Sequence, residues 1–553
     1  MKHLDAENVR VLILSAGKID NELEKIFGKI PSGLIPINGK PVIFRIIDKL
    51  LDDGIKKISI TVGYKKEILE KIVIEQYKNR CKLEFITTEF EKPPGNSIKT
   101  AMKYCFEKKM LIILGDTLID NNLTELADNE KNCVLTSQEF GETRNWCVIT
   151  KKDSIIDEIF DKKELRKDEK YHALVGCYFF NDIDLLNNVL DKFADDEKLE
   201  ISSIIKKIKD QNEFQTELAQ KWHDVGHLEN YFSTKQFVLK TRYFNSLQFD
   251  DLGKNVIKTS KNKEKLIDEI SWYKKIPEEI SKLVPNIVDS TIEDEPFIKL
   301  EYIKNPTLSE LWLYSDFPSD FWKEIIQDLF DIIQKFRRYN ESVTKEEYSS
   351  IYFQKTIDRI DELIRDNKTF KEIFEQDFIS INGKKLKNWI LIKDEIRKKI
   401  NTMYDEDDNC LIHGDLYFSN ILYDSEKKIF KLIDPRGRWG NGIAGDIKYD
   451  IAKIRHSVVG CFDTITNGLY SVKYNEKNEI NFNVFESKNY QIICDELDKN
   501  IKRNWDLDEI KMIEGLLFIS MLPLHKDNFE RQIAFYSVGI QRLNEIFGNV
   551  WKI

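Results

Sequence analysis

Short apolar runs alternate with helical patterns along the first 245 residues, and this alternation limits the folds open to that part of the chain. The apolar runs have the length of buried strands and lie at 9–14, 58–63, 83–88 and 110–116. A helical pattern, P-V-I-F-R-I-I-D-K-L-L-D-D-G, lies between the first two. Strands that alternate with helices pair into a parallel sheet with helices on its faces. The sequence therefore predicts an α/β domain with a doubly wound, mostly parallel sheet over residues 1–245.

Small and acidic residues follow two of these predicted strands. Ser15, Ala16 and Gly17 come directly after the first run, and Gly115 and Asp116 end the fourth. Ligands of open parallel sheets bind beyond the carboxyl ends of the strands. We therefore expect a ligand site where these two segments meet.

Four motifs of this domain resemble those of nucleotidylyltransferases, in particular the class that joins sugar phosphates or phospho-alcohols to an NTP. They are L-S-A-G (14–17), P-S-G-L-I-P-I-N-G-K-P (31–41), G-D-T (115–117) and W-H-D-V-G-H-L-E-N-Y (222–231). The resemblance implies a Rossmann-like nucleotidyltransferase fold. It also implies an NTP substrate and a magnesium ion.

The resemblance assigns roles to particular residues. The backbone of Ser15, Ala16 and Gly17 would bind the triphosphate, because small residues let N–H groups approach it closely. Asp116 and Asp224 would bind the Mg²⁺ that bridges the phosphates. Each aspartate taken alone also fits a turn or cap residue.

Two further segments are placed by the same resemblance. D-K at 161–162 resembles the family's E-K-P, which gives Lys162 a catalytic role at a phosphate. P-P-G-N-S-I-K-T-A at 93–101 occupies the place of the base and sugar contacts.

The chain departs from the family where a catalytic lysine is expected. The residue after Pro31 is Ser32, although a cation there would stabilise charge as pyrophosphate leaves. Lys18, Lys25 or Lys29 is a possible substitute, but spacing does not decide among them. A domain that binds nucleotide without turning it over remains the alternative.

A second set of polar residues lies at 411–437, in L-I-H-G-D-L-Y-F-S-N-I-L-Y-D and, after a charged tip, F-K-L-I-D-P-R-G. The apolar runs on either side of the tip predict a hairpin. Asp415, Asn420 and Asp434 interrupt apolar segments, where unpaired charge is costly to bury. A metal ion bound to a polyphosphate would supply partners, whereas the plainer interpretation is that these residues cap turns.

H-G-D-L-Y-F-S-N resembles the catalytic loop of the aminoglycoside phosphotransferase and choline kinase family, and I-D-P-R-G resembles its metal-binding segment. The resemblance implies that Asp415 is the catalytic base and that Asn420 and Asp434 bind Mg²⁺. ATP would be the phosphoryl donor.

The residues before this motif have the order of a kinase small lobe. Residues 246–260 predict two short strands around a turn, and a helix follows. Lys258 fits the strand lysine that contacts nucleotide phosphates, and Glu269 fits its helix partner, although a solvated lysine and an ordinary helix glutamate remain the alternative. In F-I-K-L-E-Y-I, Glu301 and Ile303 would offer backbone groups to adenine.

The rest of the chain predicts a mainly helical large lobe. Apolar residues recur at helical spacing at 321–336. We therefore expect a bilobal, protein-kinase-like α+β domain, with its small lobe and hinge at 246–305 and its large lobe at 306–553. Asp446 and Asp450 are four apart, which predicts one helix face and a role in supporting the catalytic loop. A true protein kinase is disfavoured by the lack of a Gly-rich loop and of A-P-E.

The composition limits the classes of partner that we expect for this chain. A net charge of −10 gives no electrostatic footprint for nucleic acid or an anionic membrane, and no apolar run approaches a membrane span. The eight cysteines form no C-x-x-C pair, and the first residues hold no apolar signal core, so we expect a cytoplasmic protein with reduced thiols. Its partners would be small-molecule substrates, and its oligomeric state stays open.

The two halves together predict consecutive steps. The C-terminal half would phosphorylate a sugar, polyol or amino alcohol, and the N-terminal domain would transfer an NMP, from CTP or UTP by preference, to that phosphate. The product would be an NDP-sugar or CDP-alcohol for surface polysaccharide synthesis. The alternative is a small-molecule kinase regulated by a catalytically inactive, nucleotide-binding N-terminal domain.

Overall fold

The computed structural model describes residues 8–166, 169–194, 197–239, 245–250, 252–475, 479–487 and 489–548. It divides into two compact units. The first comprises Met1–Val238 and Tyr314–Asp316, and the second comprises Leu239–Leu313 and Phe317–Ile553.

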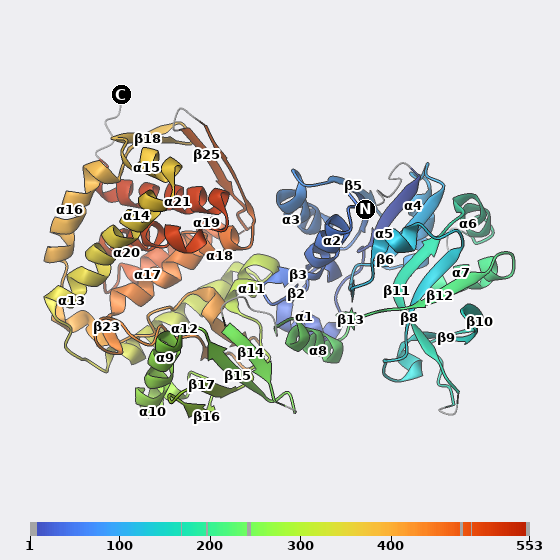
Figure 1. Cartoon of the computed structure of the whole chain (residues 1–553), viewed down its shortest axis with the longest axis horizontal. Coiled ribbons are helices and arrows are strands. Elements are labelled where there is room, and N and C mark those ends of the chain that lie inside the picture. The colour runs from blue at the N-terminus through green and yellow to red at the C-terminus, as the bar shows by residue number, and fades with distance from the viewer. Residues whose placement is uncertain are drawn as a thin grey trace. The chain divides into compact units, whose positions relative to one another are not determined.

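A nine-stranded sheet, in the order β5-β4-β1-β6-β11-β8-β12-β10-β9, forms the centre of the first unit (Figure 1). Its strands are β1 (Val9–Leu14), β4 (Lys57–Val62), β5 (Lys82–Thr87), β6 (Lys109–Leu114), β8 (Asn132–Ser137), β9 (Cys147–Lys152), β10 (Ile155–Asp161), β11 (His172–Phe180) and β12 (Phe214–Leu218). Two short pairs accompany the sheet, β2 (Pro36–Ile37) with β3 (Lys40–Pro41) and β7 (Thr117–Ile119) with β13 (Trp222–Asp224). The helices are α1 (Asn21–Phe27), α2 (Val42–Asp52), α3 (Lys66–Tyr77), α4 (Pro94–Met102), α5 (Leu123–Ala127), α6 (Ile183–Leu190), α7 (Ile201–Lys209) and α8 (Leu228–Leu239).

The predicted parallel strands are confirmed, and the sheet also contains antiparallel strands that the alternation did not indicate. β5, β4, β1 and β6 are parallel to one another, but β11 is antiparallel to its neighbours β6 and β8. β10 is likewise antiparallel to β12 and β9. All nine residues of β11 are buried, as expected for a strand covered on both faces.

The order of the first strands creates a switch point beside β1. From β1 the chain builds β4 and β5 on one side, and it then returns to place β6 on the other side. The register pairs Leu14 with Leu114, so the carboxyl ends of β1 and β6 lie side by side. Such a point is where ligands bind in open α/β sheets.

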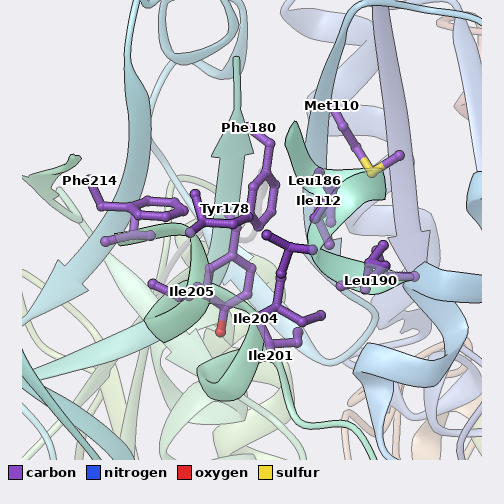
Figure 2. Packing of buried hydrophobic residues seen from close by; sticks show 14 of the residues in the cluster. Met110, Ile112, Tyr178, Phe180, Leu186, Leu190, Ile201, Ile204, Ile205 and Phe214 are labelled. Carbon is purple, nitrogen blue, oxygen red and sulfur yellow. The ribbon is translucent and has the colours of Figure 1, made fainter. Parts of the chain in front are cut away.

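One face of the sheet packs against α4, α6 and α7 (Figure 2). Tyr178 and Phe180 of β11 lie among the apolar side chains of α6 and α7, and the Phe180 ring meets Phe214 edge to face at 5.6 Å. The opposite face is buried too, because Val11 and Ile13, which alternate with the residues of this cluster, are almost fully covered.

The second unit begins with a four-stranded antiparallel sheet, β14-β15-β17-β16, against which α9 (Lys263–Lys275) packs through β15. Its strands are β14 (Asn245–Phe249), β15 (Asn255–Ser260), β16 (Ile287–Thr291) and β17 (Phe297–Glu301). The two strands and the helix predicted at 246–275 are thus present. Residues 240–244, between α8 and β14, lie outside the described part of the chain.

Helices make up most of the remainder, as predicted. They are α10 (Glu278–Ser281), α11 (Leu308–Tyr314), α12 (Ser319–Arg337), α13 (Lys345–Ser349), α14 (Lys355–Asp366), α15 (Lys368–Phe374), α16 (Trp389–Thr402), α17 (Ile447–Val458), α18 (Phe462–Thr466), α19 (Tyr490–Ile501), α20 (Leu507–Ser520) and α21 (Phe529–Phe547). The predicted hairpin is β21 (Ile421–Asp424) with β22 (Ile429–Leu432), and β20 (Asn409–Leu411) pairs with β23 (Ala444–Asp446).

A second four-stranded sheet in this unit was not predicted. It consists of β18 (Phe378–Ile381), β19 (Lys384–Lys387), β24 (Tyr470–Tyr474) and β25 (Glu479–Val484). The signal was present, because Asn382-Gly383, with φ of 50° and 75°, has the chemistry of a tight hairpin turn.

The eight cysteines are free thiols. Within the described residues, no helix combines the length and apolarity needed to cross a membrane.

The core in Figure 2 gives a stability prediction. Phe180 is 1% exposed, so Phe180→Ala should leave a cavity and cost about 3–5 kcal/mol in the free energy of unfolding. Phe106 is 92% exposed, so Phe106→Ala should change that free energy by no more than about 0.5 kcal/mol. Hydrogen–deuterium exchange of the β11 amides in the full chain measures both effects, and equal protection in the two variants would refute the prediction.

Candidate functional site

The carboxyl ends of β1 and β6 touch through small residues. The Gly115 amide donates to the Leu14 carbonyl at 2.8 Å, and a Cβ on Gly115 would lie 2.8 Å from that carbonyl and from the Ser15 Cβ. A Cβ on Gly33 would meet the Ser15 Oγ at 2.4 Å. Ser15 is buried, and its Oγ has no hydrogen-bond partner among the described residues. The turn therefore presents an unused polar group at the switch point.

Asp116 and Asp224, far apart in sequence, are brought together by the β7–β13 pair. Asp116 precedes β7, and Asp224 at the end of β13 is opposite Thr117. The Val225 amide donates to the Asp116 carbonyl at 3.0 Å. A Cβ on Gly226 would lie 3.0 Å from Asp116 Oδ2 and 3.4 Å from Asp224 Oδ1. Both carboxylates therefore border the same glycine.

The two carboxylates repel each other. Burial, together with the Asp224 charge, raises the pKa of Asp116 to about 6. Asp224 accepts a hydrogen bond from Asn230 Nδ2 at 2.8 Å, and its bond to His227 Nδ1, 3.2 Å away, raises the pKa of that histidine. A cation between the carboxylates would relieve the repulsion, and carboxylate oxygens suit Mg²⁺.

Within the described residues, no group of three or more His, Cys, Asp or Glu side chains is placed to hold a metal ion. The two aspartates fit a magnesium ion that takes its remaining ligands from phosphate oxygens and water, as Mg²⁺ does in nucleotide sites.

Lys162 lies at the end of β10 in a strained conformation, with φ of 49°. Its amide donates to the Trp146 carbonyl at 3.0 Å. The Trp146 ring contacts Trp222 of β13 at 4.8 Å and His227 at 6.1 Å. These contacts connect the Lys162 backbone to the segment that carries Asp224. The sequence motifs did not predict that Trp146, Trp222 and His227 lie together.

Ser32, where the resembled family has lysine, lies beside the Ser15–Gly17 turn. Its amide donates to the Gly17 carbonyl at 3.1 Å, and the backbone of Lys18 pairs with Pro31. Lys18, Lys25 and Lys29 are all exposed. Lys18 is thus held by backbone pairing next to the turn.

The segment at 93–101 forms nearly all of α4, which packs on the sheet. Asn96 is buried and bonds the backbone of Glu197 and Leu199 through both ends of its side chain, at 2.8 and 2.9 Å. A Cβ on Gly95 would lie 2.3 Å from the Leu199 carbonyl oxygen. These two residues therefore join α4 to the segment before α7.

In the second unit, Lys258 joins two carboxylates. Its Nζ lies 2.8 and 2.7 Å from the Glu269 oxygens and 2.9 Å from Asp434 Oδ1. Burial would lower the pKa of Lys258, but the charges of Asp434 and Glu269 raise it, so the ammonium stays charged. Asp434 has a φ of 54°, a left-handed conformation that is costly for a non-glycine residue.

Asp415 and Asn420 complete this cluster. Lys258, Glu269, Asp415, Asn420 and Asp434 line one cavity of about 140 Å³. Asn420 Nδ2 donates to the Asp415 carbonyl at 3.0 Å. The structure thus brings together all five residues that the sequence assigned to phosphoryl transfer here, and the oxygens of Asn420 and Asp434 fit a magnesium ion.

Lys453, which the sequence analysis did not select, lies against Asp415 with its Nζ 2.9 Å from Oδ1. Burial would raise the pKa of Asp415, but the Lys453 ammonium and Arg436 lower it. The available signal was the spacing of Tyr449 and Lys453, four apart in α17 and so on one helix face.

Asp450 supports the loop that leads to Asp415. Its carboxylate accepts the amides of His413 and Gly414 at 2.7 and 2.8 Å. The prediction that Asp446 shares a helix face with it was wrong, because Asp446 is the N-cap of α17 and accepts the Lys448 amide. Short polar side chains prefer that position, where they satisfy a free helix amide.

The predicted adenine contacts lie at the end of β17. The Glu301 amide is used in a bond to the Asn286 carbonyl at 2.9 Å, and its side chain accepts Asn286 Nδ2 at 2.8 Å. Within the described residues, the backbone of Ile303 makes no hydrogen bond. Ile303 therefore keeps both of its backbone polar groups available.

Comparison with known proteins concerns the first unit. Residues 11–241 match the family described as Nucleotidyl transferase. The chain carries a nucleotidyl transferase domain.

Relatives of this domain include sugar nucleotidyltransferases. The chain is 28% identical over 220 residues to the bifunctional protein GlmU of Methanococcus maripaludis. The matched region covers 39% of this chain and 51% of that protein. It is 24% identical to the D-glycero-alpha-D-manno-heptose 1-phosphate guanylyltransferase of Campylobacter jejuni over 35% of this chain and 83% of the other. The chain spans about half the length of the first of these curated relatives.

A solved UDP-glucose pyrophosphorylase in complex with UDP-glucose aligns with 42% of this chain and 100% of its own, at 18% identity and a TM-score of 0.37.

Asp116→Asn should stabilise the ligand-free nucleotidyl transferase domain, by on the order of 1 kcal/mol, because it removes one of two repelling charges. In the presence of Mg²⁺ and NTP the same variant should gain less thermal stability than the unmodified chain. Thermal denaturation with and without these ligands measures both. Asp120→Asn, at the exposed position directly after β7, is the matched control and should change neither value. A lower melting temperature for ligand-free Asp116→Asn would contradict the prediction.

Lys258→Met should destabilise the second unit by on the order of 3 kcal/mol, because Glu269 and Asp434 would lose their shared counter-charge. Lys261→Met, at an exposed position on the same segment, should cost no more than about 0.5 kcal/mol. Hydrogen exchange of the β15 and α9 amides in the full chain provides the measurement. Unchanged protection in Lys258→Met would show that the network adds nothing to stability.

Proposed function

We propose that this chain is a bifunctional enzyme. The second unit phosphorylates a small hydroxyl compound with ATP, and the nucleotidyl transferase domain joins the resulting phosphate to an NMP and releases pyrophosphate. The kinase step is supported chiefly by the Lys258–Glu269–Asp434 network, which borders the same cavity as Asp415 and Asn420. The transferase step is supported by the family match together with the meeting of Asp116 and Asp224.

In the kinase step the residues of the second unit divide the work. Asp415 accepts the proton of the attacking hydroxyl, since Lys453 and Arg436 keep its carboxylate ionised. Lys258, oriented by Glu269, binds the phosphates of ATP, and Glu301 and Ile303 face the adenine. Asn420 and Asp434 hold Mg²⁺, which neutralises charge on the phosphates when bound.

In the transferase step Asp116 and Asp224 hold Mg²⁺, which screens the triphosphate from the attacking phosphate when bound. The backbone of Ser15, Ala16 and Gly17 binds the triphosphate, and the free Ser15 Oγ donates to one of its oxygens. Lys162 orients the acceptor phosphate. Lys18, beside Ser32, supplies the cation that a lysine at position 32 would give.

The acceptor of the transferase step is most simply a sugar 1-phosphate. The name of the Campylobacter jejuni relative gives it a heptose 1-phosphate and a guanylyl group. We therefore propose an NDP-sugar as the product, used in surface polysaccharide synthesis, with GTP joining CTP and UTP as a donor to be tested.

A second candidate function follows from Ser32. Without a lysine there, the domain would bind a nucleotide and regulate the kinase instead of turning the nucleotide over. A nucleotide that changes the rate of ATP use but releases no pyrophosphate would support this candidate.

Two single substitutions in the full chain separate the steps. Asp415→Asn should reduce ADP formation by about a hundredfold or more, because the proton acceptor is lost, and should leave pyrophosphate release from NTP and added sugar 1-phosphate intact. Gly226→Ala should do the reverse, because its Cβ crowds both metal-binding carboxylates. Gly141→Ala, where a Cβ would meet nothing closer than 3.9 Å, is the control for Gly226→Ala.

The assays are coupled detection of ADP and of pyrophosphate, with each of the four NTPs. Full ADP formation by Asp415→Asn would end the kinase proposal. Full pyrophosphate release by Gly226→Ala would do the same for the metal site of the transferase.

A further inference from the structure

A large cavity of about 1020 Å³ adjoins the cluster around Asp415. It shares Asp415, Tyr417 and Asp434 with the smaller cavity that Lys258 and Asn420 line. A compound bound there would have its hydroxyl next to Asp415, so this cavity is the place for the phosphoryl acceptor.

Three partly buried cations line this cavity without a carboxylate partner. They are Lys355 and Arg359 of α14 and Arg436, two residues after Asp434. Within the described residues, no carboxylate oxygen lies within 4 Å of their nitrogens, although Asp268, Glu346 and Glu347 line the same cavity. Arg438, also at this cavity, is by contrast paired with Glu264 and Asp268 at 2.9 and 3.2 Å.

The cations converge on the hydroxyl of Tyr449. Lys355 Nζ donates to it at 3.5 Å and Arg436 Nη1 at 3.1 Å, so the two positive groups share one neutral acceptor. Lys453, which bonds Asp415, has its Nζ 6.0 Å from the centre of the same ring. Positive charge therefore surrounds the tyrosine on the side of the cavity that leads to Asp415.

This arrangement is unfavourable in the absence of a ligand. Burial, with the charges of Arg436, Arg359 and Lys453, lowers the pKa of Lys355 to about 8. Burial would raise the pKa of Tyr449, but the surrounding cations lower it to about 8. Like charges four residues apart, as at Lys355 and Arg359, also destabilise a helix. A bound anion would remove each of these costs.

The backbone that carries the cations is itself irregular. Residues Ser350–Gln354 form a π-helical turn, closed by the Lys355 amide bonding the Ser350 carbonyl. Turns of this kind inside helices occur mostly at functional sites. Lys355 is the first residue after it, and Arg359 follows on the same helix face.

We propose that the compound phosphorylated in the second unit carries an anionic group, a phosphate or a carboxylate, and that Lys355, Arg359 and Arg436 bind it. The proposal rests on the kinase step proposed above. In that step the acceptor hydroxyl oxygen forms a bond to the γ-phosphorus, the bond from that phosphorus to the β–γ bridging oxygen breaks, ADP leaves, and the hydroxyl proton passes to Asp415. Neutral polyols and amino alcohols such as choline are excluded as preferred acceptors, since the latter would place a cation among cations.

Matched acceptors test the charge preference. The full chain is assayed for ADP formation from Mg²⁺ and ATP with mannose and mannose 6-phosphate, with glycerol and D-glycerate, and with choline. We expect the anionic member of a pair to be used with a kcat/KM about tenfold or more above its neutral partner, as a charged hydrogen bond would give. Preference for a neutral compound or for choline would overturn the proposal.

Substitutions test the residues. Lys355→Met and Arg359→Met should raise the KM of the anionic acceptor about tenfold or more and leave the KM of ATP within about twofold. Lys368→Met, whose side chain on α15 is 89% exposed, is the control and should change neither constant. A rise in the KM of ATP without a rise for the acceptor would assign these cations to the nucleotide and overturn the proposal.

A binding measurement separates this proposal from the kinase step. If no compound yields ADP, the kinase step fails, and the anion site is judged by calorimetric titration of D-glycerate and of inorganic phosphate in the presence of Mg²⁺ and a non-hydrolysable ATP analogue. Binding to the unmodified chain that is lost in Lys355→Met and kept in Lys368→Met supports the anion site. Absent binding, or equal binding to both variants, refutes it.

Discussion

At two places, folding brings charges of the same sign together without a counter-charge. A ligand of the opposite charge would stabilise each of these places. Two other buried cations of the second unit are paired: Arg455 lies between Asp498 and Glu514, and Lys448 between Asp408 and Glu509. Isolated charge is expensive to bury, so such pairing is the rule in proteins. The Asp116–Asp224 pair and the cations around Tyr449 depart from it, the first with excess negative and the second with excess positive charge.

The sign of the unbalanced charge at each site is opposite to that of the ligand proposed for the site. A pair of carboxylates calls for a metal ion, and with it the phosphates of a nucleotide. The cations around Tyr449 would bind an anion without a metal ion between them. Lys258 stands between these cases, because Glu269 and Asp434 already neutralise it in the free protein. Nucleotide binding in the second unit would therefore redistribute existing ion pairs, whereas binding in the first unit would supply a missing charge.

Strain accompanies charge at two of the candidate residues. Asp434 and Lys162 both have positive φ, although neither is a glycine. Such conformations cost on the order of 1 kcal/mol or more and persist only where surrounding contacts fix them. The Lys258 ion pair holds Asp434, and the Trp146 carbonyl holds the Lys162 amide.

Local periodicity gave correct expectations where the pattern is strong. The four parallel strands, the hairpin at β21–β22 and the order of β14, β15 and α9 were predicted, because each depends on a short stretch of residues. The antiparallel insertion of β11 was not, since a fully buried strand has the same composition in either direction. Nor was the sheet of β18, β19, β24 and β25, whose members lie about ninety residues apart and whose only local signal was Asn382-Gly383.

The candidate-site residues also divide into those that local spacing predicts and those that it does not. Asp415, Asn420 and Asp434 were found because their spacing is fixed within one loop and hairpin. Lys355 and Arg359 were not, because their meeting with Arg436 depends on how α14 packs, which no motif encodes. The misplacement of Asp446 has a smaller cause, because the helix begins one residue later than the spacing assumed.

The π-helical turn before Lys355 has a consequence for how this cavity can change. It accommodates one residue more than a regular helical turn, and successive residues of an α-helix are about 100° apart around the axis. Loss of a single residue from Ser350–Gln354 would therefore restore a regular helical turn and keep Lys355 and Arg359 on the face that lines the cavity. A deletion between Lys355 and Arg359 would instead move Arg359 by about 100° around the axis of α14 and so separate the two cations.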